Sequence, residues 1–136
     1  MLPLLAIALP LTDLHVDPSA SNCSTADGSP AAPFCTLDDA LQAAVDGDRL
    51  LLAPGDYAPG SVVTEDVEIV GTLGPDRTRI VGGVGGPTVL TIAAGATVRV
   101  DGLTVRGGVQ SGTGAAGLDV LGDLTLVRSW VLDNEG

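Results

Sequence analysis

Residues 97–106, TVRVDGLTVR, and residues 123–132, DLTLVRSWVL, carry the same pattern of aliphatic side chains at an offset of 26 residues. The positions that coincide are Val98 with Leu124, Val100 with Leu126, and Val105 with Val131. Short runs with apolar side chains at alternate positions are typical of β-strands. A pair of strands that recurs at a fixed spacing indicates a structural repeat.

The repeat extends toward the N-terminus with a drifting period. Aliphatic pairs precede their counterparts by 28 residues (Leu90 and Ile92 before Leu118 and Val120) and by 31 residues (Val67 and Ile69 before Val98 and Val100). Fixed strand spacing within a variable period predicts a solenoid whose extra residues lie in loops, such as Val109–Ala115. We therefore predict an all-β parallel β-helix, in which each coil stacks about 4.8 Å from the one before it.

Composition favours the solenoid over a β-sandwich, which would also give short strands. The turns are mostly single glycines, and the strands come in groups of two or three per period. Apolar residues make up 45% of the 136, yet only Phe34, Tyr57 and Trp130 are aromatic, so the core must be thin. The length suits one domain, and the 17% of charged residues is too low for general disorder.

One helix is predicted, over residues 36–46, before the repeats. Thr36 is a suitable N-cap, and Asp39 three residues later completes an Asp variant of the capping box. An apolar stripe at helical spacing follows, and Gly47 stands where a left-handed C-terminal residue is expected.

The net charge limits the classes of partner that the chain can bind, and the two cysteines indicate its cellular compartment. Seventeen acidic residues face six arginines, a net charge of −11, which argues against a nucleic-acid partner. Such a surface suggests at most weak Ca²⁺ association, and we predict no cofactor. Cys23 and Cys35 suggest a disulfide and an oxidising compartment. The alternatives are a zinc site, for which the chain offers only His15 as a further N or S ligand, and two unpaired core thiols.

Residues 1–12 begin with an apolar run, LPLLAIALP, that is too short to cross a bilayer. We interpret it as a truncated secretion signal, although no basic residue precedes it. The alternative is a strand that covers the first coil. The expected organisation is an apolar leader at 1–12, an N-terminal cap at 13–48 and β-helix coils at 49–136.

Residues 14–57 resemble the opening of right-handed parallel β-helix proteins of the pectate-lyase-like superfamily. The matching positions are Val16, Asp17, Gly28, Pro33, Phe34, Thr36, Leu37, Ala40, Gly47, Asp48, Leu50–Leu52, Pro54, Gly55 and Tyr57. The resemblance implies that the helix shields the apolar end of the first coil. Phe34 would pack under that helix, Tyr57 would pack at the first turn, and the Cys23–Cys35 link would tie the loop to the helix. These are structural roles.

No catalytic residue is predicted in this segment. His15 lies outside the repeats, and the repeat aspartates (Asp101, Asp119, Asp123 and Asp133) are not in register, since Asp101 aligns with Val127. We expect these aspartates to be solvated in turns. Arg99 and Arg106 are the nearest candidates for the base that a polysaccharide lyase needs. Trp130 aligns with the outward position Thr104, so it is expected on the surface.

The sequence therefore predicts a secreted or cell-surface scaffold, located extracellularly, that contacts carbohydrate or a surface component. Two alternatives remain open. One is a polysaccharide lyase or glycoside hydrolase whose active site lies on later coils, and the other is an adhesin or passenger-type stalk. Because the last coil resembles an ordinary one, we expect further coils beyond Gly136.

Overall fold

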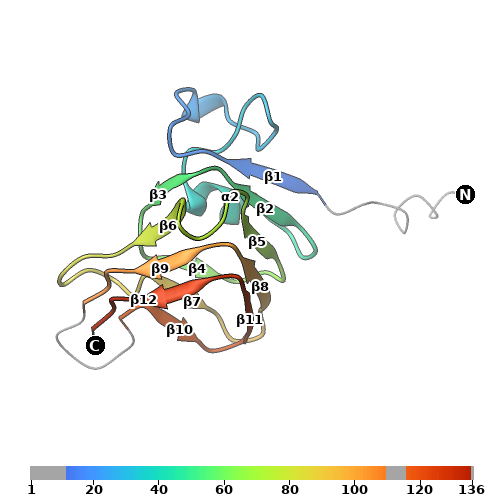
Figure 1. Cartoon of the computed structure of the whole chain (residues 1–136). Helices are drawn as coiled ribbons and strands as arrows, with labels where there is room; N and C mark the ends of the chain where they lie inside the picture. Colours follow the sequence, from blue (N-terminus) through green and yellow to red (C-terminus); the bar gives the residue numbers. More distant parts are fainter. Residues whose placement is uncertain (1–11, 110–115, 136) are drawn as a thin grey trace, which may run out of the picture.

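The computed structural model describes residues 12–109 and 116–135. The predicted leader and most of the predicted loop Val109–Ala115 lie outside these residues. The regular secondary structure of the described chain is mostly β-strand, and the strands form three parallel sheets (Figure 1).

Successive strands of the chain enter the three sheets in a constant order. Sheet 1 contains β1 (Asp13–Val16), β2 (Arg49–Leu52), β5 (Glu68–Gly71), β8 (Thr97–Asp101) and β11 (Asp123–Val127). Sheet 2 contains β3 (Gly55–Tyr57), β6 (Thr78–Val81), β9 (Thr104–Arg106) and β12 (Trp130–Leu132). Sheet 3 contains β4 (Ser61–Val63), β7 (Leu90–Ile92) and β10 (Leu118–Val120). After β1, the chain passes through sheets 1, 2 and 3 repeatedly, which is compatible with an all-β solenoid.

The strand register confirms the offsets read from the sequence. The partners across the last two coils are Val98 with Leu124, Val105 with Val131, and Leu90 with Leu118. The 31-residue offset is also confirmed, because Ile69 pairs with Val100. Aliphatic periodicity alone therefore identified four of the pairs of neighbouring strands.

Side chains at alternate strand positions point inward and stack on their equivalents in the next coil. In sheet 1 one such column is Leu50, Ile69 and Val100, each 0% exposed. Equivalent columns in the other sheets bury Ile80 and Ile92. The core is thin and aliphatic, and it stabilises the stack through apolar contact between successive coils.

Two glycines face each other where adjacent coils approach closely. A Cβ built on Gly71 would lie 2.2 Å from the carbonyl oxygen of Gly102. Gly102 itself has a φ of +79°, which side chains rarely adopt, and a Cβ there would lie 2.6 Å from the carbonyl oxygen of Gly71. Neither position has room for a larger residue.

The segment before the repeats holds a short 3₁₀ helix, η1 (Cys23–Thr25), and the helix α2 (Leu37–Ala43). The Thr36 hydroxyl accepts a hydrogen bond from the Asp39 amide, as predicted for the N-cap. Helix α2 contacts β1 and β4, so it lies against the first coil (Figure 1).

The predicted end of the helix at residue 46 is wrong, because α2 ends at Ala43. Ala44 is already extended, and Val45 is 62% exposed. Gly47 does have a positive φ of 95°, but it lies in a turn after the helix. Hydrogen bonds to the next coil hold this turn, since the Gly47 amide donates to Asp66 O and Asp46 accepts from the Asp66 amide. These contacts direct the chain into β2.

Candidate functional site

The N-terminal segment is joined to the start of α2 by a disulfide between Cys23 and Cys35. This bond removes both alternatives, a zinc site and free thiols. Cys35 directly precedes Thr36, the N-cap of α2. The disulfide therefore fixes the loop before the helix to the point where the helix begins.

The two aromatic residues near this segment have structural contacts. Tyr57 is 3% exposed, and its hydroxyl donates a hydrogen bond to the Ala53 carbonyl oxygen at 2.6 Å. Burial raises the pKa of the Tyr57 hydroxyl, so it stays protonated. Phe34 is partly buried against the core, and its ring lies so close to Gly28 that a Cβ there would be 2.8 Å from it.

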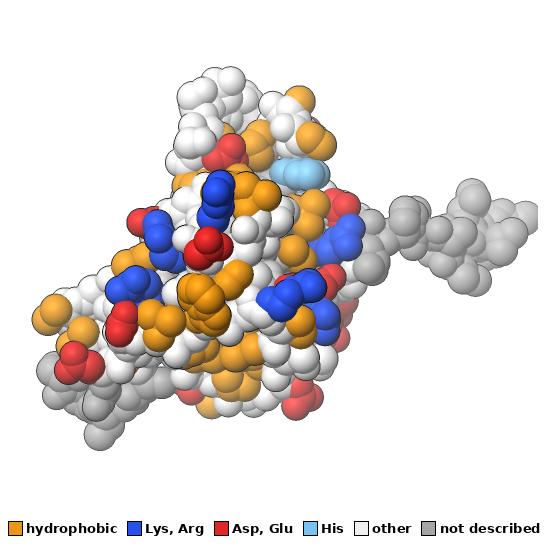
Figure 2. All heavy atoms as spheres, viewed as in Figure 1, with side chains coloured by type: hydrophobic (Ala, Val, Ile, Leu, Met, Phe, Trp, Pro, Cys, Tyr) orange, Lys and Arg blue, Asp and Glu red, His pale blue; other side chains and the backbone are white. Residues whose placement is uncertain are grey.

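The outer faces of the sheets carry a set of ion pairs that the sequence analysis missed. Five of the six arginines pair with a carboxylate on an adjacent coil. Figure 2 shows basic and acidic side chains next to each other on one such face. The pairs are Arg49 with Asp13, Arg79 with Asp56, Arg99 with Glu68, Arg106 with Asp133, and Arg128 with Asp101.

On sheet 1 these residues form a column of alternating charge. Asp13 pairs in register with Arg49, Arg49 with Glu68, and Glu68 with Arg99. The hydrogen bond from Arg49 lowers the pKa of the Asp13 carboxyl. The register of the coils could have revealed this column, because each arginine aligns with an acid one repeat away.

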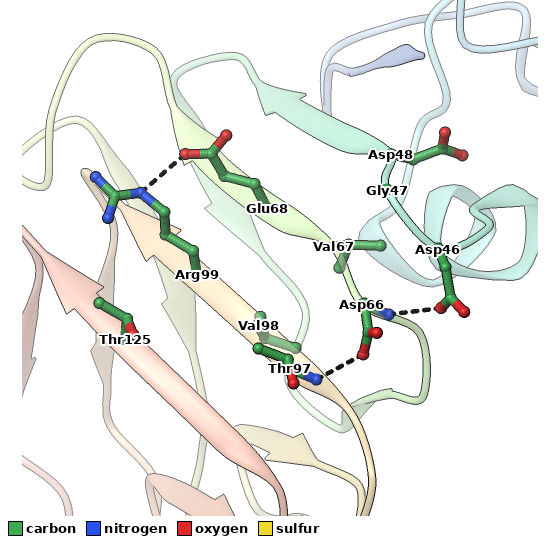
Figure 3. A pocket seen from close by; sticks show the side chains of 10 residues that line it. All are labelled: Asp46, Gly47, Asp48, Asp66, Val67, Glu68, Thr97, Val98, Arg99 and Thr125. Atoms are coloured by element: carbon green, nitrogen blue, oxygen red, sulfur yellow. Dashed lines mark hydrogen bonds and ion pairs between the residues drawn. The ribbon is translucent and has the colours of Figure 1, made fainter. Parts of the chain in front are cut away.

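A shallow groove of about 670 Å³ lies at the edge of sheet 1 where its strands begin (Figure 3). Its walls carry the carboxylates Asp46, Asp48, Asp66 and Glu68. Each of these acids has a partner within the fold. Asp46 accepts from the Asp66 amide, Asp66 from the Thr97 amide at 2.7 Å, Asp48 from the Val45 amide, and Glu68 from Arg99.

Three of the groove acids, Asp46, Asp66 and Glu68, therefore bridge successive coils, whereas Asp48 bonds within its own turn. Two of them accept backbone N–H groups at the start of a coil, which would otherwise face solvent. Among the described residues no group of three or more His, Cys, Asp or Glu side chains is arranged to hold a metal ion. The groove joins coils through the hydrogen bonds of its own acids.

The sequence-derived candidates for catalysis are dispersed. His15 lies on β1 and lines a separate cavity of about 170 Å³. Of the two candidate bases, Arg99 binds Glu68 and Arg106 binds Asp133.

The expectation that the repeat aspartates are solvated in turns is wrong for Asp101. Asp101 is 7% exposed and accepts two hydrogen bonds from Arg128, and the paired carboxylate raises the pKa of that guanidinium. Asp133 also binds Arg106, but it lies just after β12 and its side chain is 62% exposed, so it is solvated as expected. These side chains are separated from their partners by 27 residues, so only stacking brings them together.

Trp130 lies at the outward position predicted for it, in register with Thr104, and it is 49% exposed. The same outward column contains Arg79 and Asp56. The indole is therefore a large exposed apolar surface on a face that otherwise carries charges.

Comparisons with protein-family models, with curated proteins and with solved structures found no match. In the part of the chain that the structure describes, no helix is long and apolar enough to cross a membrane.

Proposed function

We propose that this chain is a secreted or cell-surface scaffold, built as a right-handed parallel β-helix of the pectate-lyase-like superfamily, whose outer face contacts carbohydrate. The constant order in which the chain enters three parallel sheets supports the fold. The disulfide is consistent with an extracellular location, since such bonds persist in oxidising compartments.

The observation that best supports the scaffold role is that arginines on the outer faces form ion pairs with carboxylates of adjacent coils. A polysaccharide lyase needs a basic side chain free to take a proton from its substrate. Arg99 and Arg106 instead hold carboxylates at 3.0 and 2.9 Å on adjacent coils. Ion pairs of this kind join adjacent coils. They also occupy the two guanidinium groups that a lyase reaction would need as a base.

Trp130 is the residue we assign to carbohydrate contact. Its indole is half exposed and lies on the outer face of sheet 2. The face of an indole ring provides a large apolar contact at little cost in conformational entropy. The indole N–H can donate a hydrogen bond to a sugar hydroxyl. Since the chain has a single tryptophan, its fluorescence reports directly on this position.

The test uses the disulfide-intact protein with a panel of uronate and neutral polysaccharides. Binding is followed by co-sedimentation and by tryptophan fluorescence. Trp130→Ala should abolish co-sedimentation, whereas Leu73→Ala, at an exposed position before β6, should leave it unchanged. The absence of binding to every polymer would overturn the carbohydrate part of the proposal.

Two further measurements separate the alternatives. Incubation with polygalacturonate and Ca²⁺, followed by the absorbance of the unsaturated product, should give no signal, and product formation would favour the lyase. Fractionation of the source cells should place the protein outside the cytosol. Recovery with reduced cysteines from the cytosol would contradict the extracellular location.

A further inference from the structure

A small cavity lies where the start of helix α2 meets the turn between β3 and β4. Its volume is about 290 Å³, near the lower end of the range for ligand pockets. The loop after β1 contributes Pro18, the first turn of α2 contributes Leu37 and Asp38, and the segment from β3 to β4 contributes Tyr57 and Ser61. None of the described residues that line it also lines the groove of sheet 1. The cavity is therefore a separate feature of the first coil and its cap.

The walls of the cavity are largely apolar, and the fold holds them in place. Leu37 and Tyr57 belong to the core and are 2% and 3% exposed. The hydrogen bond from the Tyr57 hydroxyl to Ala53 O fixes the phenol ring. The disulfide fixes Cys35, which also lines the cavity. A ligand would therefore enter a preformed site, and little binding free energy would be lost in ordering its walls.

The polar side chains of the cavity include acids but, among the described residues that line it, no base. They are the carboxylates of Asp38 and Asp56 and the hydroxyls of Thr36 and Ser61. Ser61 is 2% exposed, and its hydroxyl donates a hydrogen bond to Asp38 Oδ1 at 2.6 Å. This contact with a buried side chain holds the Asp38 carboxylate at the wall of the cavity.

Each of the two carboxylates has one oxygen engaged. Asp38 Oδ1 accepts from Ser61, and Asp56 Oδ1 accepts from Arg79 Nε at 2.7 Å. In the described part of the chain, neither second oxygen accepts a hydrogen bond. Since Asp56 has an arginine partner, Asp38 is the main source of negative charge. The cavity therefore offers a charged acceptor beside an apolar wall, where an ionic hydrogen bond is stronger than in bulk water.

We propose that this cavity binds a small organic cation, a primary alkylammonium whose N–H groups donate to Asp38 and whose short hydrocarbon chain packs against Pro18 and Leu37. An ammonium group has three donors and no acceptor, which matches free carboxylate oxygens. A neutral alcohol of the same length has one donor and no charge, and an anion would be repelled. The site is independent of the carbohydrate contact assigned to Trp130, which lies on the strand at the opposite edge of sheet 2 from Asp56.

The test uses the full chain with its disulfide intact and probes of equal hydrocarbon length: n-butylammonium, 1-butanol and butyrate. Each probe is titrated at neutral pH and constant ionic strength, and binding is followed by the backbone amide chemical shifts in NMR spectra. We expect n-butylammonium to bind saturably and at least about tenfold more tightly than 1-butanol, and butyrate not to bind. The shifts should centre on residues 35–38 and 56–61, where most of the cavity wall lies.

A pair of substitutions on one helical turn locates the charge that binds the probe. Asp38→Asn should weaken binding of n-butylammonium by at least about tenfold, because it removes the charge while the amide oxygen can still accept from Ser61. Asp39→Asn is the matched control and should leave binding unchanged. Asp39 is exposed on the same turn of α2, and it does not line the cavity.

Ala58→Leu tests the cavity itself and keeps the proposal testable if Asp38→Asn fails to fold. Ala58 lines the cavity and is exposed, so a larger side chain can fill the space without entering the core. This variant keeps both carboxylates and should abolish saturable binding. The proposal is overturned if n-butylammonium does not bind, or binds no better than 1-butanol. It is also overturned if Asp39→Asn weakens binding as much as Asp38→Asn, or if Ala58→Leu leaves binding unchanged, since either result would indicate general attraction to an acidic surface.

Discussion

Thr78 offers a direct test of how the interior of the stack is held together. This residue of β6 is 0% exposed, and its hydroxyl has no hydrogen-bond partner among the residues that the structure describes. Burial of an unpaired hydroxyl costs about 1–3 kcal/mol. Thr78→Val replaces the hydroxyl with a methyl group of nearly the same shape, so it removes this cost and keeps the packing.

We expect Thr78→Val to raise the free energy of unfolding by about 1–2 kcal/mol, which combines the removed cost with the gain from burying a methyl group. For a chain of this size the melting temperature should rise by about 4–8 °C. The measurement is denaturation in guanidinium chloride, followed by circular dichroism of the β-structure. The denaturant slope should stay the same, because the area exposed on unfolding does not change.

Thr104 provides the matched control on the neighbouring strand. It is 2% exposed, but its hydroxyl donates a hydrogen bond to the Pro75 carbonyl oxygen at 2.6 Å. Thr104→Val breaks this bond and should lower the free energy of unfolding by about 1 kcal/mol. The same substitution therefore has opposite signs at two buried threonines of one sheet. Loss of stability in Thr78→Val, or the same sign for both variants, would refute the reasoning.

Three further predictions follow from other parts of the fold. Gly71→Ala should destabilise the chain by about 3 kcal/mol or more in the same denaturation assay, because its Cβ would meet a backbone carbonyl at 2.2 Å. Gly83→Ala is the control, because the new Cβ would have open space around it, and it should change the free energy of unfolding by less than about 0.5 kcal/mol. Equal losses of stability in the two variants would contradict the close approach of Gly71 to Gly102. The intact mass should rise by the mass of two hydrogen atoms on reduction of the disulfide. Exchange of Cys23 and Cys35 for Ser should lower the free energy of unfolding by about 3 kcal/mol, and an unchanged denaturation midpoint would argue against this contribution. The lowered pKa of the Asp13 carboxyl stabilises the fold above about pH 4, and this stability is lost as the pH falls through the folded-state pKa. Denaturation at stepped pH should show a shallower acid dependence in Asp13→Asn, and an identical dependence would contradict the assignment.

The sequence by itself determined four of the strand pairings, chiefly those of the later coils. Alternation of aliphatic side chains distinguishes the inside from the outside of a strand, and the 26-residue offset paired Val98 with Leu124 without any knowledge of the fold. The same alignment placed Trp130 opposite Thr104 on the outer face. These features were predictable because each depends only on spacing along the chain.

Only the tertiary structure decided how polar groups are satisfied between coils. Asp101 and Arg128 are 27 residues apart, so their ion pair exists only because the coils stack in a particular register. Helix α2 ends at Ala43, before Gly47, because Asp66 of the following coil bonds the turn after the helix. Local patterns specify where a strand can form. The hydrogen bonds and charges between coils depend on neighbours that only the folded chain brings together.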